Sequence, residues 1–432
     1  MKAWRCAVAR GLVFFALIMI TGCAGRSHAV TKSPHGLSQP DSLTETPAEK
    51  TPHATSGSSE SPYQDITQIT PGQIIHLRTG LSMTEESVMA HLSEARIVYA
   101  GEVHDSLEDH RVQLKILKGL VARFPGKVVV GMEMFQRSSQ DLMDQWIRGE
   151  ADDKAFLKRW YEDWSHDDAY YRELLDFIKA QKIPVIALRP TAEMSFKMRA
   201  KGMDGLSEND RRKLPEIDTS DPYHRAAVNA IFQGHGPGAS NQFDSFYEMM
   251  LFWEETMAET IADYLVSPEG RDKKMMVMAG GFHVGYGFGI PRRTFRRLPM
   301  PYQIVISHAQ DFPDEMKMLN VTPPNLPLPL ADFVWGVAYR PLEKKKVRLG
   351  VMLEQFQAGV RISDVFPESP ADKAGIERGD IITTFDGQAV HERFDIIFRL
   401  QQKKPGDRVK IKILRNGKSI ETEAVMAVSG HP

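Results

Sequence analysis

The sequence is poor in cysteine. It has two in 432 residues, Cys6 and Cys23, and both stand near the amino terminus. The rest of the chain therefore has no thiol with which to build a disulfide framework or a thiolate metal site. A basic excess is also missing, because the formal net charge is −2. Nucleic-acid binders normally carry clustered Lys and Arg, so the composition argues against a nucleic-acid partner.

Long apolar runs are scarce as well. The run Leu12–Ile20 is too short to span a membrane comfortably, and it follows the basic residues Lys2, Arg5 and Arg10. A basic start followed by a short apolar centre is typical of a secretory signal peptide. We therefore expect a signal in residues 1–22.

The end of this segment resembles the bacterial lipobox. It reads Ile20-Thr21-Gly22-Cys23, and in a lipobox the signal is cut before the cysteine, which is then lipidated. The resemblance implies a lipid anchor on Cys23, since two or three acyl chains hold a protein stably at a bilayer. Because Ala24 rather than Asp follows, it also implies the outer membrane, with the protein facing the periplasm. The alternative is an ordinary cleaved signal.

Two regions of different composition follow. Residues 23–65 are dominated by Ser, Thr, Pro, Gly, Glu and His, so they cannot bury enough apolar surface to fold and are predicted to form a disordered tether. In residues 66–310, apolar strand patterns alternate with helical patterns. This alternation predicts an α/β domain whose mostly parallel sheet has helices on both faces.

Polar side chains stand where three of the predicted strands end. The residues concerned are Glu102 and His104, Glu133, and His283 in Gly280-Gly281-Phe282-His283. Open α/β sheets keep their sites at the carboxyl ends of the strands, so we expect these four side chains to meet. Two imidazoles and two carboxylates suit a divalent ion such as Fe, Mn or Zn with open positions. They suit acid–base catalysis without a metal equally well.

The pattern changes after residue 310. Residues 311–345 contain six prolines and are predicted to be a linker, and residues 346–428 show short β runs with tight turns. This small β-rich domain resembles a PDZ domain over its whole length. The resemblance implies binding of peptide or protein carboxyl termini by Arg348, Leu349, Gly350, Val351, Met352 and Leu353. Use of the module only for docking or dimerisation is the alternative. No Gly-x-Ser-x-Gly motif is present, so the module is expected to recruit rather than cut.

The α/β region resembles the ChaN family of haem-binding bacterial lipoproteins. Their superfamily also includes the Tiki and TraB proteins and the erythromycin esterases. The resemblance spans Ile66 to Ile306 and rests on five motifs: Gly101-Glu102-Val103-His104-Asp105, Gly131-Met132-Glu133-Met134-Phe135, the aromatic stretch Trp160–Tyr171, Glu255-Thr256-Met257-Ala258-Glu259, and Gly280–His283 with Gly289-Ile290-Pro291-Arg292. Metal-dependent and esterase members of the superfamily use the paired Gly-x-x-His and the intervening Glu.

The resemblance implies a haem-binding role. ChaN proteins hold haem between protomers through Tyr and His, which implies a possible homodimer. His104 and His283 are candidate haem contacts, and Arg292 and Arg293 are candidates for the propionates, unless the basic cluster is only a solvated face. No tyrosine follows Glu133 closely, so the axial ligand stays open among Tyr161, Tyr170, Tyr171, Tyr247 and Tyr286.

Three functions are consistent with the sequence. We expect first an anchored lipoprotein that binds haem or iron during uptake or handling and recruits a partner through its PDZ domain. A metal-dependent hydrolase is the second, with Glu102 or Glu133 as general base and the histidines as metal ligands or acid partners. A periplasmic scaffold with a vestigial site is the third.

Overall fold

A computed structural model describes residues 63, 66–233, 243–311, 326, 328–343, 347–356 and 359–428. The predicted signal and nearly all of the predicted tether lie outside these residues. Within the described part, no helix is long and apolar enough to cross a bilayer.

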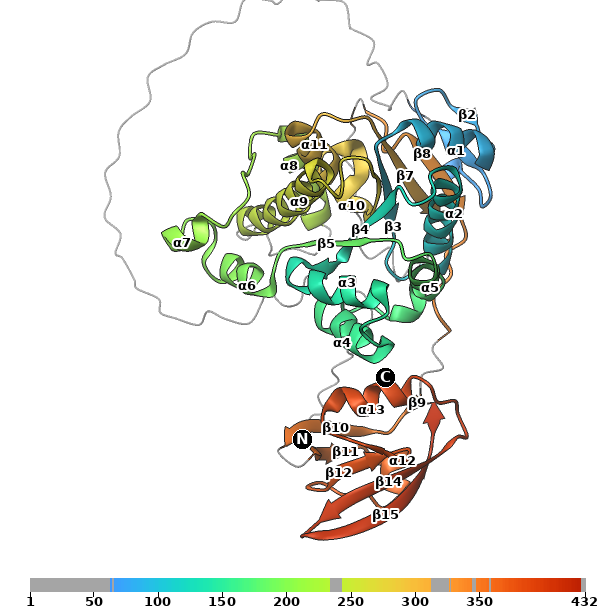
Figure 1. The fold of residues 1–432 in the computed structure, drawn as a ribbon, viewed down its shortest axis with the longest axis vertical. Coiled ribbons are helices and arrows are strands. Elements are labelled where there is room, and N and C mark those ends of the chain that lie inside the picture. Colours follow the sequence, from blue (N-terminus) through green and yellow to red (C-terminus); the bar gives the residue numbers. More distant parts are fainter. Residues whose placement is uncertain are drawn as a thin grey trace, which may run out of the picture. The chain divides into compact units, whose positions relative to one another are not determined.

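The first domain is built on one mixed sheet (Figure 1). Its described strands lie in the order β2-β1-β8-β7-β3-β6-β4-β5. The pairs from β8 to β5 are parallel, and β1 pairs antiparallel with β2 and β8. The bounds are β1 (Ile74–His76), β2 (Leu81–Ser82), β3 (Ile97–Glu102), β4 (Val128–Gln136), β5 (Val185–Arg189), β6 (Lys274–Gly280), β7 (Tyr302–Ala309) and β8 (Phe333–Val337).

Helices cover both faces of this sheet, as predicted (Figure 1). Their bounds are α1 (Glu85–Glu94), α2 (Leu107–Arg123), α3 (Gln140–Arg148), α4 (Asp153–Asp163), α5 (Arg172–Ala180), α6 (Ala192–Lys201), α7 (Glu208–Arg211), α8 (Pro222–Gln233), α9 (Phe243–Val266), α10 (Gly281–Val284) and α11 (Ile290–Arg297). Short 3₁₀ turns include Asp168–Tyr170 and Gly285–Gly287.

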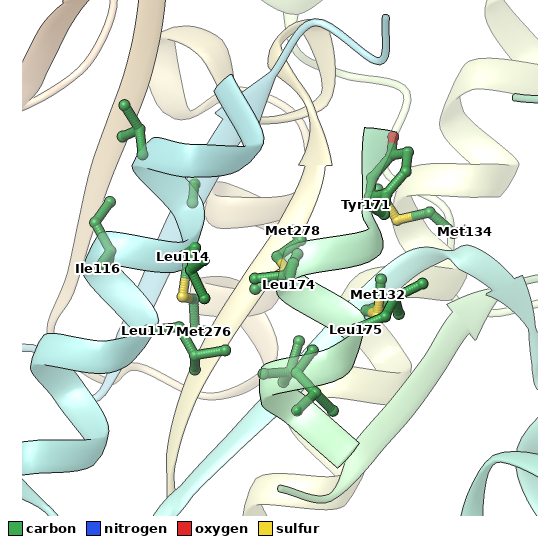
Figure 2. Packing of buried hydrophobic residues seen from close by; sticks show 14 of the residues in the cluster. Leu114, Ile116, Leu117, Met132, Met134, Tyr171, Leu174, Leu175, Met276 and Met278 are labelled. Carbon is green, nitrogen blue, oxygen red and sulfur yellow. The ribbon is translucent and has the colours of Figure 1, made fainter. Parts of the chain in front are cut away.

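The two cores follow from strand alternation. Successive side chains of β3 point to opposite faces. Val98 and Ala100 join the core that α2 and α5 complete, while Tyr99 joins the core formed with α9. Figure 2 shows the first core, where the methionines of β4 and β6 meet leucines of α2 and α5. A strand buried on both faces reads as a continuous apolar run, which is why the sequence revealed these strands.

The prediction of a linker over residues 311–345 needs correction. Phe333–Val337 is strand β8, which lies between β1 and β7 in the main sheet. Its residues are all buried. The prolines before it hid the strand, because a five-residue run gives a weak periodic signal beside so many turn formers. The first domain thus extends past residue 310.

The carboxy-terminal domain is the predicted small β-rich unit. It contains β9 (Val347–Arg348), β10 (Val351–Phe356), β11 (Gly359–Val365), α12 (Pro370–Lys373), β12 (Ile381–Phe385), β13 (Gln388–Ala389), α13 (Arg393–Leu400), β14 (Arg408–Arg415), β15 (Lys418–Val425) and β16 (Ala427–Val428). The main path of its larger sheet is β10-β11-β12-β14-β15, all antiparallel, with a core of its own. Gln388–Ala389 pairs with β12.

Candidate functional site

Three adjacent parallel strands bring the predicted residues together. β3, β6 and β4 are neighbours, and Glu102 at the end of β3 pairs with Gly280 at the end of β6. The backbone N–H of Gly280 donates to Oε2 of Glu133 over 2.8 Å. Glu102 and Glu133 thus lie close to Gly280, as predicted, although β4 does not end at Glu133 but continues to Gln136.

Glu102 is the centre of the first half of the site. It is buried, and its Oε1 accepts from the Tyr171 hydroxyl (2.6 Å) and from Nδ1 of His104 (2.9 Å), while Oε2 lies 3.2 Å from Nδ1 of His110. Burial would raise the pKa of Glu102. The charge of His110 and the hydrogen bonds of both histidines outweigh burial and hold that pKa well below its usual range.

His110 is a buried imidazolium. Its Nδ1 faces Glu102 and also Oε1 of Gln113 (3.1 Å), and its Nε2 lies 3.2 Å from the carbonyl oxygen of His104. Both ring nitrogens thus point at acceptors, so both carry protons. Burial lowers the pKa of His110. The charge of Glu102 and its hydrogen bond raise this pKa by more than burial lowers it, so the net shift is upward.

The hydrogen bond to Glu102 sets the tautomer of His104. Because Nδ1 donates to the carboxylate, Nε2 carries the lone pair when the ring is neutral. A Cβ on Gly280 would lie 3.1 Å from this Nε2 and 3.7 Å from Oε2 of Glu133. A side chain at this position would push against the His104 ring, so glycine lets His104 and Glu133 lie on the two sides of Gly280.

The second half of the site is a chain of alternating charges. Nε2 of His283 lies 3.4 Å from Oε1 of Glu133, and its Nδ1 lies 3.2 Å from Oε1 of Glu254. Burial lowers the pKa of His283, but the two carboxylates raise it to about 10. Burial in turn raises the pKa of Glu133, yet His283 brings it down to about 2. At neutral pH the group is therefore carboxylate, imidazolium, carboxylate.

Arg293 closes this chain from α11. The side chain is 1% exposed, and it donates to Oε2 of Glu254 (3.3 Å), to Oε1 of Glu255 (2.9 Å) and to Nδ1 of His224 (3.0 Å). The prediction that Arg293 binds haem propionates is therefore wrong, because the guanidinium is buried and already bonds protein groups. Arg292 remains half-exposed, paired with Asp221 and Asp218.

Sequence reasoning missed His110, His224 and Glu254, and it named Tyr171 only as one of five candidate axial ligands. Glu254 and Glu255 lie on the long helix α9, and both are 0% exposed. The one sequence signal for such a buried carboxylate is a charged residue on an otherwise apolar helix face. Charged residues are mostly exposed to solvent, so this signal is weak. His110 lies on α2, Tyr171 directly before α5, His224 on α8 and Glu254 on α9. No local pattern connects these elements with β4.

The predicted Fe, Mn or Zn site is not formed by these residues. Within the described ranges, no group of three or more His, Cys, Asp or Glu side chains is arranged to hold a metal ion. The geometry gives the reason, since both ring nitrogens of His283 and Nδ1 of His104 already bond carboxylates. The four predicted residues therefore form a hydrogen-bonded acid–base network.

The indole ring of Trp164 packs edge-to-face against the imidazole of His104. The two rings lie 4.8 Å apart at 87°, His166 lies 5.0 Å from His104, and the guanidinium of Arg189 stands 5.1 Å over the indole. Burial, followed by the charge of His104, lowers the pKa of His166 to about 4. His166 is thus a neutral ring at physiological pH.

In the second domain, the predicted peptide-binding residues form the turn before β10 and the strand itself. Gly350 has φ +80°, and a Cβ there would lie 2.2 Å from Cβ of Ser369, so only glycine fits this turn. Leu349 is buried in the core, and its carbonyl accepts from Ala371 over 2.9 Å. Leu349 can therefore serve a ligand through its backbone, whereas Arg348 and Met352 have exposed side chains.

Comparison with known proteins finds a separate match for each of the two domains. Residues 88–294 match the family model "Haem-binding uptake, Tiki superfamily, ChaN", and residues 347–425 match the PDZ domain model. A solved structure described as "Cofacial heme binding to ChaN of Campylobacter jejuni" is 14% identical, with a TM-score of 0.48, and the match covers 62% of this chain and 96% of that one.

Two curated relatives are similar to different parts of the chain. Protein RETICULATA-RELATED 5, chloroplastic, of Arabidopsis thaliana is 23% identical over 76% of this chain and 45% of its own. The periplasmic pH-dependent serine endoprotease DegQ of Escherichia coli is 38% identical over 17% of this chain and 16% of its own. The chain thus spans less than half the length of either relative.

Proposed function

We propose that this protein, in which a ChaN-like haem-binding domain is followed by a PDZ domain, is a membrane-anchored lipoprotein that handles haem or iron. The observation that carries the proposal is the match of residues 88–294 to a family described by haem-binding uptake. The PDZ domain supports a second role, in which the protein binds a peptide or protein partner.

Few of the predicted contacts are available to haem. Haem iron needs an axial donor such as His or Tyr, and the propionates need polar or basic partners. His283 and Arg293 are buried among carboxylates, which leaves His104 and Arg292. The side chain of His104 is 21% exposed, and Arg292 is 48% exposed.

Tyr286 is the tyrosine that fits the axial position best. Tyr161 and Tyr171 donate to Asp168 and Glu102, Tyr170 accepts from the N–H of Leu342, and Tyr247 is buried against His224. Within the described residues, the hydroxyl of Tyr286 makes no hydrogen bond, and its ring is half-buried.

The backbone at Tyr286 supports the same assignment. Its φ of 55° is unusual for a residue with a side chain, and such strain gathers at functional positions. Its N–H donates to Leu330 over 2.7 Å, and its ring stacks on Phe288 at 5.8 Å. Phe282, in the preceding α10, is 60% exposed and offers an apolar surface to the porphyrin. Haem would supply a redox-active iron held by this chain.

Tyr286→Phe should weaken haem binding about tenfold or more, because it removes the proposed oxygen donor and keeps the ring. The measurement is the Soret band during titration of ferric haem into full-length protein in mild detergent. Tyr223→Phe is the matched control, since Tyr223 is 51% exposed and stacks on Phe288 at 6.2 Å. Equal affinity in Tyr286→Phe and wild type would contradict the assignment, and a loss in His104→Ala would move it to His104.

A hydrolase is the second candidate function. It is favoured by the Glu102–His104 pair, in which the carboxylate orients the ring and Nε2 faces Glu133 across Gly280. Such a base can take a proton from water while Glu102 stabilises the imidazolium that forms. This candidate would replace the first if the protein bound no haem and cleaved a p-nitrophenyl ester, with the rate lost in His104→Asn.

Membrane anchoring is part of the proposal through Cys23, which follows the lipobox-like sequence. An acylated protein should sediment with outer membranes, whereas Cys23→Ser should leave it in the soluble fraction. Retention of Cys23→Ser in the membrane would count against the anchor.

A further inference from the structure

We propose that Arg189 binds a carboxylate of the ligand that reaches His104, which in haem is a propionate. The inference rests on the proposed haem-handling function and deepens it, because it supplies the basic partner that the buried Arg293 cannot provide. It is carried by the place of Arg189 in the sheet, by its contacts at the end of α4, and by the charge that these contacts leave unmatched.

Arg189 stands at the same edge of the sheet as the residues of the site. It is the last residue of β5, which pairs in parallel with β4, and it lies opposite Gln136, the last residue of β4. The other four residues of β5 are buried, whereas Arg189 is only partly buried. Open α/β sheets keep their sites at the carboxyl ends of parallel strands, so this side chain is placed to meet a ligand.

The end of α4 holds the guanidinium of Arg189 in place. The guanidinium lies over the Trp164 ring, 5.1 Å from the ring centroid, and donates a hydrogen bond to the carbonyl oxygen of Asp163. Asp163 is the last residue of α4, and the carbonyl groups at the end of a helix attract cations. Trp164 is 1% exposed, so the ring is a fixed support. These two contacts orient the guanidinium without using a carboxylate.

The described residues leave the charge of Arg189 unmatched. A guanidinium has five N–H donors, and in the part of the chain that the structure describes its hydrogen-bond acceptor is the carbonyl of Asp163. The carboxylate of Asp163 accepts instead from Ser139, and the carboxylate of Glu133 faces His283. Burial lowers the pKa of Arg189, and the charges of Glu133 and Asp163 offset this lowering only in part. A partly desolvated cation of this kind is stabilised by an anion supplied by a ligand.

Trp164 connects this cation with His104. The ring of His104 lies 4.8 Å from that of Trp164 and 5.0 Å from that of His166, and the last two rings lie 5.2 Å apart. One indole thus separates the guanidinium from the imidazole, a spacing that the flexible propionate of a haem at His104 can bridge. His166 is neutral at physiological pH because its pKa is lowered to about 4, so it does not repel a carboxylate, and its N–H can donate to one.

Other arginines of the site already have acidic partners. Arg293 contacts Glu254 and Glu255, and Arg292 pairs with Asp221. Arginine can bind one carboxylate through two parallel N–H···O bonds, which requires free donors on the guanidinium. Arg189 retains such donors beside the site, whereas the donors of Arg293 are used within the protein.

The test compares ferric haem with its dimethyl ester, which has the same iron and ring but no propionate charge. Both are titrated into the full-length protein in mild detergent, and the Soret band gives the affinities. Haem should bind about tenfold more tightly than the ester, the size expected for hydrogen bonds to a charged group. Arg189→Gln should remove this difference by weakening haem binding alone. Ester binding at the wild-type level shows that the variant is folded.

Further variants make the assignment specific. Arg189→Lys keeps the charge and should keep part of the preference for haem, whereas Arg148→Gln, an exposed arginine of α3, should keep all of it. Equal affinities of the wild type for haem and ester, or an unchanged preference in Arg189→Gln, would overturn the inference and leave haem binding standing. Loss of the preference in Arg292→Gln alone would also overturn it, in favour of Arg292. A wild type that binds neither compound would overturn the proposed function together with this inference.

Discussion

Arg293→Met is expected to lower the free energy of unfolding by about 3–5 kcal/mol, the range for breaking a buried ion pair from one side. Methionine is similar to arginine in length and flexibility but leaves Glu254 and Glu255 without the buried guanidinium that contacts both of them. Both carboxylates are 0% exposed, so water cannot take over this role. Arg293 is therefore a structural residue of the site.

Denaturant unfolding monitored by tryptophan fluorescence measures this loss of stability in the first domain, which contains Arg293. All six tryptophans precede residue 346, so the signal does not come from the PDZ domain. Arg148→Met is the control, because Arg148 lies exposed on α3 with Glu150 as its partner, and it should leave the midpoint unchanged. A loss below about 1 kcal/mol in Arg293→Met would mean that Arg296 and Arg297, which also contact Glu255, compensate.

His283→Asn should destabilise the protein by a similar amount, about 3–5 kcal/mol near pH 6, and the loss should depend on pH. The pKa of His283 is raised from 6.5 to about 10 in the folded protein. Its charge therefore stabilises the fold fully below pH 6.5, and this contribution disappears as the pH rises through 10. The difference between wild type and variant should shrink over that interval.

Glu133 sets the lowest pH at which the charged pair with His283 stabilises the fold. Its pKa is lowered from 4.5 to about 2, so its contribution is present above pH 4.5 and is lost as the pH falls through 2. The stability difference should thus be largest between pH 4.5 and 6.5. Unfolding curves at pH 5.5, 7.5 and 9.5 check this, with His91→Asn, an exposed histidine of α1, as control. A difference that stays constant across the three values would show that His283 is not charged.

These two effects explain how the site is held. The alternating charges from Arg293 to Glu133 lie on α11, α9, α10 and β4, and each carboxylate has a cation on at least one side. Removing one member leaves a buried charge unpaired, which costs more than the pair itself contributes. A network of this kind fixes Glu133 beside Gly280 and leaves His104 as the member of the group nearest to solvent.

Much of the fold could be predicted because it depends on local patterns. β3 and β6 are apolar runs that end in polar residues, and the parallel arrangement follows from the alternation with helices. β8 could not be predicted, because five residues among prolines carry almost no periodic signal. Its pairing with β1 joins segments more than two hundred residues apart in the sequence, such as Ile74 and Trp335.

The four strand-end residues were visible in the sequence for the same reason that the strands were. Polar side chains at the carboxyl ends of parallel strands share one edge of the sheet, so Glu102, Glu133 and His283 had to be close. The partners of these residues were not visible. Glu254 and Arg293 differ from ordinary surface residues only in being enclosed, and enclosure depends on how α9 and α11 pack. That packing turned a predicted metal site into a hydrogen-bonded network, because both ring nitrogens of His283 bond carboxylates on other elements, Glu133 on β4 and Glu254 on α9.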